Sequence, residues 1–103
     1  MRVITRQPFV EAEKNYPNDA QAIRDVFQTL KRGHFADPLE MRQVFPSLDN
    51  FKYKDKWWVI NIGGNNLRLL ACILFRPQIV YVKHIVTHPE YDRLTERARR
   101  GEL

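Results

Sequence analysis

The stretch NIGGNNLRLLACILF, from Asn61 to Phe75, decides the fold because it joins two apolar strands through a tight turn. Glycine and asparagine tolerate the positive φ of a hairpin turn, so Gly63-Gly-Asn-Asn66 predicts one. Arg68 is the only charged residue of the stretch. A guanidinium keeps its proton in proteins, and burying it without a partner is costly. Arg68 therefore predicts either an internal carboxylate partner or a groove that receives an anion.

The sequence around this hairpin predicts an antiparallel meander of three strands. The strands are expected over Lys56–Ile62, Leu67–Phe75 and Ile79–Val86, which are rich in β-branched and aromatic residues. The following segment THPE fits a capping box, with Thr87 as N-cap and Glu90 at the third helical position. We therefore expect a short helix from there toward Arg97, starting where the third strand ends.

The first half of the chain predicts helices. We expect a short strand over Arg2–Thr5, helices over Pro8–Tyr16 and Ala20–Arg32, and a helical turn or two over Leu39–Phe45. Asp19 is the candidate N-cap of the second helix, whose Ile23, Val26, Phe27 and Leu30 form one apolar stripe. The order β-α-α-β-β-β-α indicates an α+β domain with an antiparallel sheet, an N-terminal helical hairpin and helices on one side.

Composition limits the class of protein. The 103 residues are 44% hydrophobic, which suits a single domain, 1–103, with one modest core. No segment approaches the roughly 20 apolar residues of a membrane helix, and MRVITRQPF lacks the apolar region of a secretory signal. Cys72 is the only cysteine and lies in an apolar run, which is typical of the reducing cytosol. We expect a cytoplasmic protein without contact to membranes.

The net charge favours an anionic partner. Seventeen Lys and Arg against twelve Asp and Glu give +5, which suits RNA, DNA or an acidic protein. The basic residues recur in three clusters: Lys52, Lys54 and Lys56; Lys83 and His84; and Arg93, Arg97, Arg99 and Arg100. Each cluster has an alternative interpretation as a solvated face without function.

Candidate chemistry gathers at the start of the last helix, where unpaired N–H groups attract phosphate. His88, Tyr91 and Asp92 follow the cap, Lys83 lies on the strand before it, and Arg68 faces them if the meander is regular. RNA supplies a nucleophile in its 2′-hydroxyl, so a base, an acid and cations suffice for cleavage. Three scattered histidines and one cysteine do not form a zinc set, so we expect neither metal nor cofactor.

Each of these residues has a simpler interpretation. His88 is also a common residue at a helix start, and Tyr91 shares a helical face with Leu94 and can pack in the core. Arg68 can pair with a carboxylate. Lys83 and His88 are five positions apart, which places them on opposite faces unless a bulge or bend intervenes.

Two segments resemble a known family: VFPSLDNFKYKDKWWVINIGGNNLRLLACILF and VYVKHIVTHPEYDRL. Together they are similar to the HigB-type toxins of bacterial toxin–antitoxin pairs, relatives of the RelE-like mRNA interferases. The resemblance is strongest from Val44 to Asp92. It implies an endoribonuclease that cuts mRNA in the ribosomal A site and stops translation. It also implies a cognate HigA-like antitoxin with a helix-turn-helix domain, through which alone the toxin would meet operator DNA.

The resemblance also implies roles for individual residues. Arg68 matches an arginine that contacts the scissile phosphate, Lys83 matches a basic position on the last strand, and His88 and Tyr91 match proton-transfer positions. We favour His88 as base with Tyr91 assisting, and the swapped assignment stays open. Candidate RNA contacts are Lys52, Lys54, Lys56 and Arg93.

The sequence departs from the family at one point. RelE-like enzymes carry lysines on the strand before the hairpin, where this chain has Val59 and Asn61. Two alternatives to the nuclease follow from charge alone. One is a non-catalytic basic module that binds RNA or the ribosome and blocks translation by occupancy, and the other is a structural partner for an acidic protein.

Overall fold

The predicted hairpin is the centre of the fold. The computed structural model describes residues 1–103. Strands β3 (Trp57–Ile62) and β4 (Leu67–Leu74) are antiparallel and place Asn61 opposite Arg68. Gly63 and Gly64 take positive φ values of 63° and 69°, as the turn requires. The prediction of a Gly-Gly-Asn-Asn hairpin is confirmed.

The sheet has five strands in the order β1-β5-β4-β3-β2. Strand β5 (Ile79–Thr87) completes the antiparallel meander, and β2 (Asp49–Asn50) adds an unpredicted edge. Strand β1 (Arg2–Val3) pairs with β5 in parallel, so the expectation of an entirely antiparallel sheet is wrong at this edge. A helical connection separates β1 from the meander, and such a connection allows parallel pairing where a hairpin would forbid it. The α+β class is confirmed.

The helices are close to their predicted bounds. They are α1 (Gln7–Asn15), α2 (Ala20–Arg32), α3 (Pro38–Val44) and α4 (His88–Arg99), with a 3₁₀ turn η1 (Pro17–Asp19) between α1 and α2. The capping box of Thr87 and Glu90 is present. Asp19 stands at the N-cap of α2 without making a capping hydrogen bond, which corrects its predicted role. No helix is both long and apolar enough to cross a membrane.

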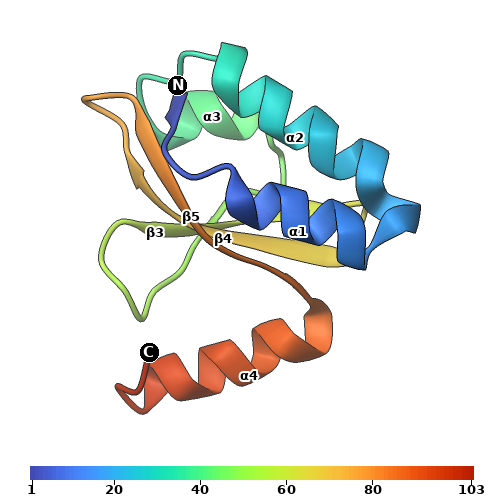
Figure 1. Ribbon diagram of the computed structural model, residues 1–103. Coiled ribbons are helices and arrows are strands. Elements are labelled where there is room, and N and C mark those ends of the chain that lie inside the picture. Colours follow the sequence, from blue (N-terminus) through green and yellow to red (C-terminus); the bar gives the residue numbers. More distant parts are fainter.

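Helices cover both faces of the sheet (Figure 1), so the expectation of helices on one side is wrong. Figure 1 shows α1, α2 and α3 on one face and α4 on the other. Leu69, Ala71 and Ile73 of β4 point into the larger core, whereas Leu70 packs with Phe51, Val59 and Ala98 under α4. A strand buried on both faces is a continuous apolar run, and β4 has that composition.

Strand β5 contains a bulge at Lys83. The pairing runs from Leu70 opposite His84 to Ala71 opposite Val82, which leaves Lys83 without a partner. The extra residue reverses the alternation, so that Val82 and Ile85 both point into the larger core. Lys83 and His88 were expected on opposite faces of the sheet unless a bulge intervened, and this bulge is present.

Candidate active site

Arg68 lies on β4 without a carboxylate partner. Its Nη1 donates to the carbonyl oxygens of Asn65 at 3.1 Å and Leu67 at 3.4 Å, and its Nη2 lies 3.2 Å from His88 Nδ1. None of the ion pairs in the chain includes Arg68. The backbone and the imidazole thus orient the guanidinium, and its charge stays available for an anion.

His88 is the first residue of α4 and lies between Arg68 and Asp92. Its Nε2 is 3.5 Å from Asp92 Oδ1, and the side chain is 54% exposed. A guanidinium can only donate, so His88 Nδ1 accepts the hydrogen bond from Arg68 and carries no proton in this state. If Arg68 turns to a phosphate, this nitrogen becomes free to take a proton.

Tyr91 contributes a half-buried phenol to the same end of α4. Its ring packs edge-on against Phe51, with 6.1 Å between ring centroids. Burial raises the pKa of Tyr91, the carboxylates of Asp49 and Asp92 add to this rise, and Arg68 opposes it. The phenol therefore keeps its proton near neutral pH. Tyr91 packs in a core and also lies near charged residues, and its role in proton transfer stays a prediction.

Asn61 is a neighbour of the site that sequence reasoning did not assign. The β3–β4 register places it directly opposite Arg68, and its Nδ2 donates to Asn65 Oδ1 at 3.3 Å. It occupies the strand on which RelE-like enzymes carry lysine. The hairpin register, counted from the turn, was the signal that could have found it.

A groove leads away from Tyr91 between α4 and the segment before β3. It is a cavity of about 380 Å³, open to solvent. Its lining residues are Asp49, Asn50, Phe51, Lys52, Tyr53, Tyr91, Asp92 and Thr95. The lining thus combines aromatic rings and one lysine with the carboxylates of Asp49 and Asp92.

Lys83 does not lie beside Arg68 and His88. Its Nζ sits over the rings of Trp57 and Tyr81, at 5.9 Å and 5.6 Å from their centroids. Trp57 and Tyr81 are the two neighbours of Cys72 in the sheet. Cys72 lies four residues along β4 from Arg68, which is roughly 13 Å at the usual rise per residue. The structure thus separates Lys83 from the residues with which it was grouped.

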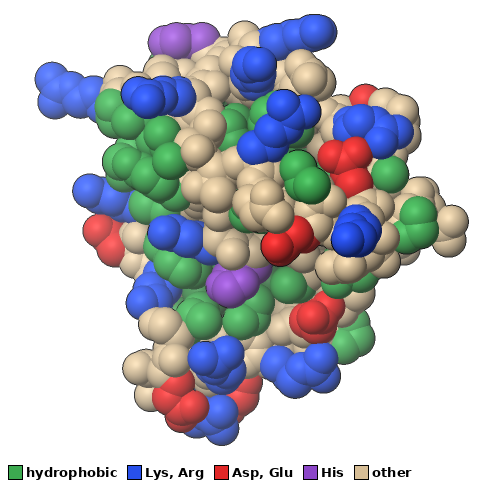
Figure 2. All heavy atoms as spheres, in the orientation of Figure 1, with side chains coloured by type: hydrophobic (Ala, Val, Ile, Leu, Met, Phe, Trp, Pro, Cys, Tyr) green, Lys and Arg blue, Asp and Glu red, His purple; other side chains and the backbone are tan.

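The predicted RNA contacts lie on three separate surfaces. Lys52 lies over Tyr53 at 5.3 Å and Lys54 over Trp57 at 5.6 Å, so both join the aromatic surface that holds Lys83. Lys56 has a positive φ of 64° and lines a separate hollow with Phe75 and Pro77. Figure 2 shows Lys and Arg side chains spread over one face of the molecule, several of them around α4, with carboxylates among them.

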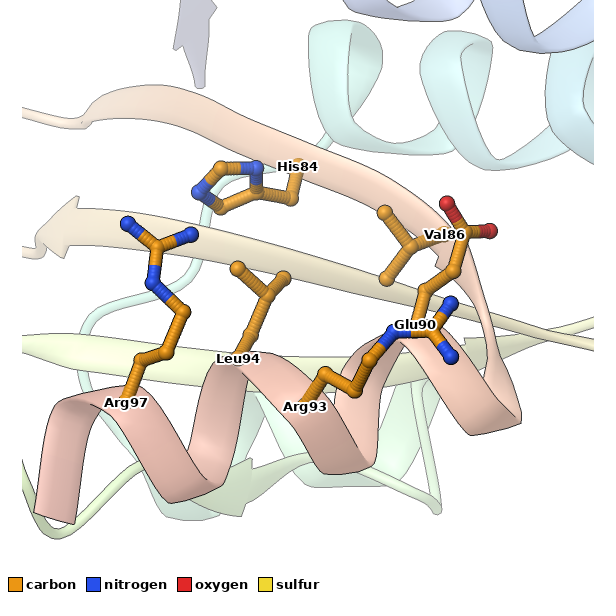
Figure 3. Close-up of a pocket in the computed structure, with 6 residues that line it drawn as sticks. All are labelled: His84, Val86, Glu90, Arg93, Leu94 and Arg97. Atoms are coloured by element: carbon orange, nitrogen blue, oxygen red, sulfur yellow. The ribbon is translucent and has the colours of Figure 1, made fainter.

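Arg93 lies on the part of α4 that faces β5 (Figure 3). There it lines a groove of about 320 Å³ with His84, Val86, Glu90, Leu94 and Arg97. Burial lowers the pKa of His84, and the charges of Arg97 and Lys83 add to that effect. This groove is separate from the Arg68–His88 pair. In no part of the chain do three or more His, Cys, Asp or Glu residues gather where they could hold a metal ion.

Comparison with known proteins identifies the family of this chain. Residues 19–94 match the HigB toxin family, described as the RelE-like toxic component of a toxin–antitoxin system. The chain belongs to this family. It is 47% identical over 102 residues to an mRNA interferase HigB of Escherichia coli O6:H1, covering 99% of both proteins. It is 41% identical over 95 residues to the mRNA interferase toxin HigB of E. coli K12, covering 92% of this chain and 91% of that protein.

The family assignment confirms the resemblance seen in the sequence. A HigB-type toxin belongs to a two-component system, so this chain has an antitoxin partner. Two segments, residues 44–75 and 80–94, carried that resemblance, and they supply Arg68 and His88.

Proposed function

We propose that this HigB-type toxin is an endoribonuclease that cleaves mRNA while the ribosome translates it. The contact between Arg68 Nη2 and His88 Nδ1 carries the proposal, because it joins a cation without a carboxylate partner to an imidazole nitrogen that can accept a proton. The names of the relatives, mRNA interferase HigB, support the same activity.

The reaction begins when the scissile phosphate draws the guanidinium of Arg68 away from His88. The freed Nδ1 takes the proton of the adjacent 2′-hydroxyl, and the 2′-oxygen forms a bond to phosphorus. Arg68 stabilises the charge that develops on the phosphorane oxygens, so the chain's own cation does this work without a metal. The accepting state of Nδ1 favours His88 as the base over the swapped assignment.

Tyr91 completes the cleavage as the acid. The bond from phosphorus to the 5′-oxygen breaks, and the phenol gives its proton to that oxygen. The raised pKa of Tyr91 means that the phenol is protonated before the step and so has a proton to give. The products are a 2′,3′-cyclic phosphate and a 5′-hydroxyl end, and His88 returns its proton through solvent.

The aromatic surface formed by Tyr53, Trp57 and Tyr81 binds RNA beyond the scissile bond. Lys52, Lys54 and Lys83 supply charge, and the rings beneath them supply stacking faces. We therefore assign Lys83 to binding of the RNA backbone and not to the scissile phosphate. Lys56 and Arg93 lie on other surfaces and contact RNA or the ribosome there.

The partners follow from the family. We propose a HigA-like antitoxin with a helix-turn-helix domain, operator DNA reached only through the toxin–antitoxin complex, and a cytoplasmic location where ribosomes are found. Membership in a toxin–antitoxin family supports the antitoxin, and the +5 charge supports a nucleic-acid substrate.

Primer extension tests the activity. A translated mRNA of known sequence is mapped after brief induction of the wild-type toxin or Arg68→Ala, and a second mRNA lacks its start codon. We expect cuts inside the reading frame that require both Arg68 and translation. Growth arrest without new 5′ ends would instead mean that the protein blocks translation by occupancy.

A further inference from the structure

We infer that the connection between α1 and α2, residues 16–19, positions both halves of the active site through Tyr16 and Asp19. The inference rests on the proposed nuclease function. Neither residue touches the Arg68–His88 pair, so both are positioning residues. One side chain of the connection holds the start of α4, and the other holds the turn before β4.

The first anchor runs from Tyr16 to the segment that carries His88. Tyr16 Oη donates to Glu90 Oε1 at 3.1 Å, across 74 positions of sequence. The same oxygen accepts from the backbone N–H of Thr87 at 3.1 Å and from Thr87 Oγ1 at 2.8 Å. Thr87 is the last residue of the β4–β5 ladder, so His88 follows the last sheet pairing. The capping box and Tyr16 therefore fix where the chain leaves the sheet.

The second anchor runs from Asp19 to the turn that precedes Arg68. Asp19 Oδ1 accepts from Asn66 Nδ2 at 3.1 Å, and the carboxylate sits so close to Gly63 that a Cβ there would collide with it. Asp19 makes no capping hydrogen bond to α2, although it stands at the N-cap. Its side chain serves the turn instead, and that turn contains Asn65, whose carbonyl oxygen orients Arg68.

The two anchors share one short piece of backbone. The N–H of Asp19 donates to the carbonyl oxygen of Tyr16 at 2.9 Å, which closes the connection into a 3₁₀ turn. This 3₁₀ turn thus contacts both the β3–β4 turn and the start of α4. Arg68 and His88 lie on different elements, and the distance between them depends on this common reference.

A purely structural role does not explain the arrangement well. The Asp19–Asn66 hydrogen bond is exposed, and such bonds contribute little to folding. The rate of a reaction between positioned groups, by contrast, falls about a hundredfold for a displacement of about 1 Å. The Asp19 anchor therefore matters more for geometry than for stability.

The test compares Tyr16→Phe, Asp19→Ala and Asp19→Asn with the wild type and with Asp25→Ala, an exposed aspartate of α2 that contacts Gln21. Single-turnover cleavage of ribosome-bound mRNA is measured over a range of toxin concentrations. We expect Tyr16→Phe and Asp19→Ala to lower the maximal rate about tenfold, with half-saturation and urea midpoint unchanged. Asp19→Asn keeps an accepting oxygen and restores most of the rate.

A second measurement reads the geometry without cleavage. The imidazole ¹⁵N shifts of His88 report whether Nδ1 still accepts from Arg68. We expect these shifts to move in Tyr16→Phe and Asp19→Ala but not in Asp25→Ala. Unchanged shifts and rates within about twofold of the wild type in both variants would overturn the positioning role. A wild type that cuts no mRNA would instead refute the proposed function, and the shifts would still decide the positioning.

Discussion

Arg68→Lys distinguishes catalysis from electrostatic binding. The substitution keeps the positive charge but removes the fork, that is, the two terminal nitrogens of the planar guanidinium. Arg68 uses Nη1 for the carbonyl oxygens of Asn65 and Leu67 and Nη2 for His88, so Nη1 is anchored on the backbone while Nη2 can turn from His88 to a phosphate. A lysine ammonium has a single nitrogen on a flexible stem. It cannot hold the carbonyl oxygens and the phosphorane at the same time without losing one of them.

The expected magnitude follows from that loss. Removing one positioned donor from a developing oxyanion lowers the rate by about 10²- to 10³-fold, or about 2.7–4 kcal/mol. Lysine retains the charge, so we expect the lower limit for Arg68→Lys, about 10²-fold. Arg68→Ala loses charge and geometry together and should fall by about 10³-fold. Stability changes little in either variant, because the side chain is only half-buried and its bonds to the backbone are partly exposed.

The assay is a time course of cleavage in a reconstituted translation system, with a defined mRNA and cut ends counted by primer extension. Arg24→Lys is the matched control, since Arg24 lies on α2 and pairs with Glu13 at 2.8 Å. Its rate should equal that of the wild type. Cleavage by Arg68→Lys within about threefold of the wild type would refute the fork argument and leave charge alone as the role of Arg68.

Three further predictions follow. Tyr91→Phe removes the proposed acid but keeps the ring against Phe51, so cleavage should fall about 10²-fold with an unchanged urea midpoint; a wild-type rate would exclude Tyr91 as the acid. Leu70→Ala, at a fully buried position under α4, should lower the free energy of unfolding by about 2–5 kcal/mol, and a loss below about 1 kcal/mol would contradict the packing. The hydrogen bonds from Thr87 lower the pKa of Glu90, so its stabilisation is present above the unfolded pKa and is lost as pH falls through the folded value. Between neutral and acidic pH, Glu90→Gln should therefore lose less stability than the wild type in urea titrations, and parallel losses would contradict the linkage.

Local signals were sufficient for most of the fold. The turn Gly63–Asn66 and the capping box of Thr87 each depend on backbone requirements that a few neighbouring residues meet. The apolar stripe of Ala20–Arg32 likewise follows from the helical period alone. These elements lie within one or two residues of their predicted bounds because no distant part of the chain competes with them.

Strand pairing, helix placement and contacts between distant residues could not be predicted in the same way. The two residues of β1 can pair in either direction, and their partners, Ile79 and Val80, lie 77 positions further along the chain. The apolar run of β4 indicates burial on both faces but does not state which helix covers which face. Tyr16 and Asp19 contact residues 74 and 47 positions away, and nothing near them in the sequence marks them as neighbours of the active site.

The geometry of the site depends on one residue, Lys83, which interrupts the pairing of β4 with β5. Continuing the register of Leu74 opposite Ile79 without interruption would pair Arg68 with Ile85, and Ile85 would then leave the larger core. The bulge at Lys83 moves the partner to Val86, two positions before His88. The single extra residue in β5 therefore places His88 next to Arg68 and at the same time keeps Ile85 in the larger core. That residue is Lys83, whose side chain was expected in the active site, and the structure shows it instead as the bulge that sets the position of His88.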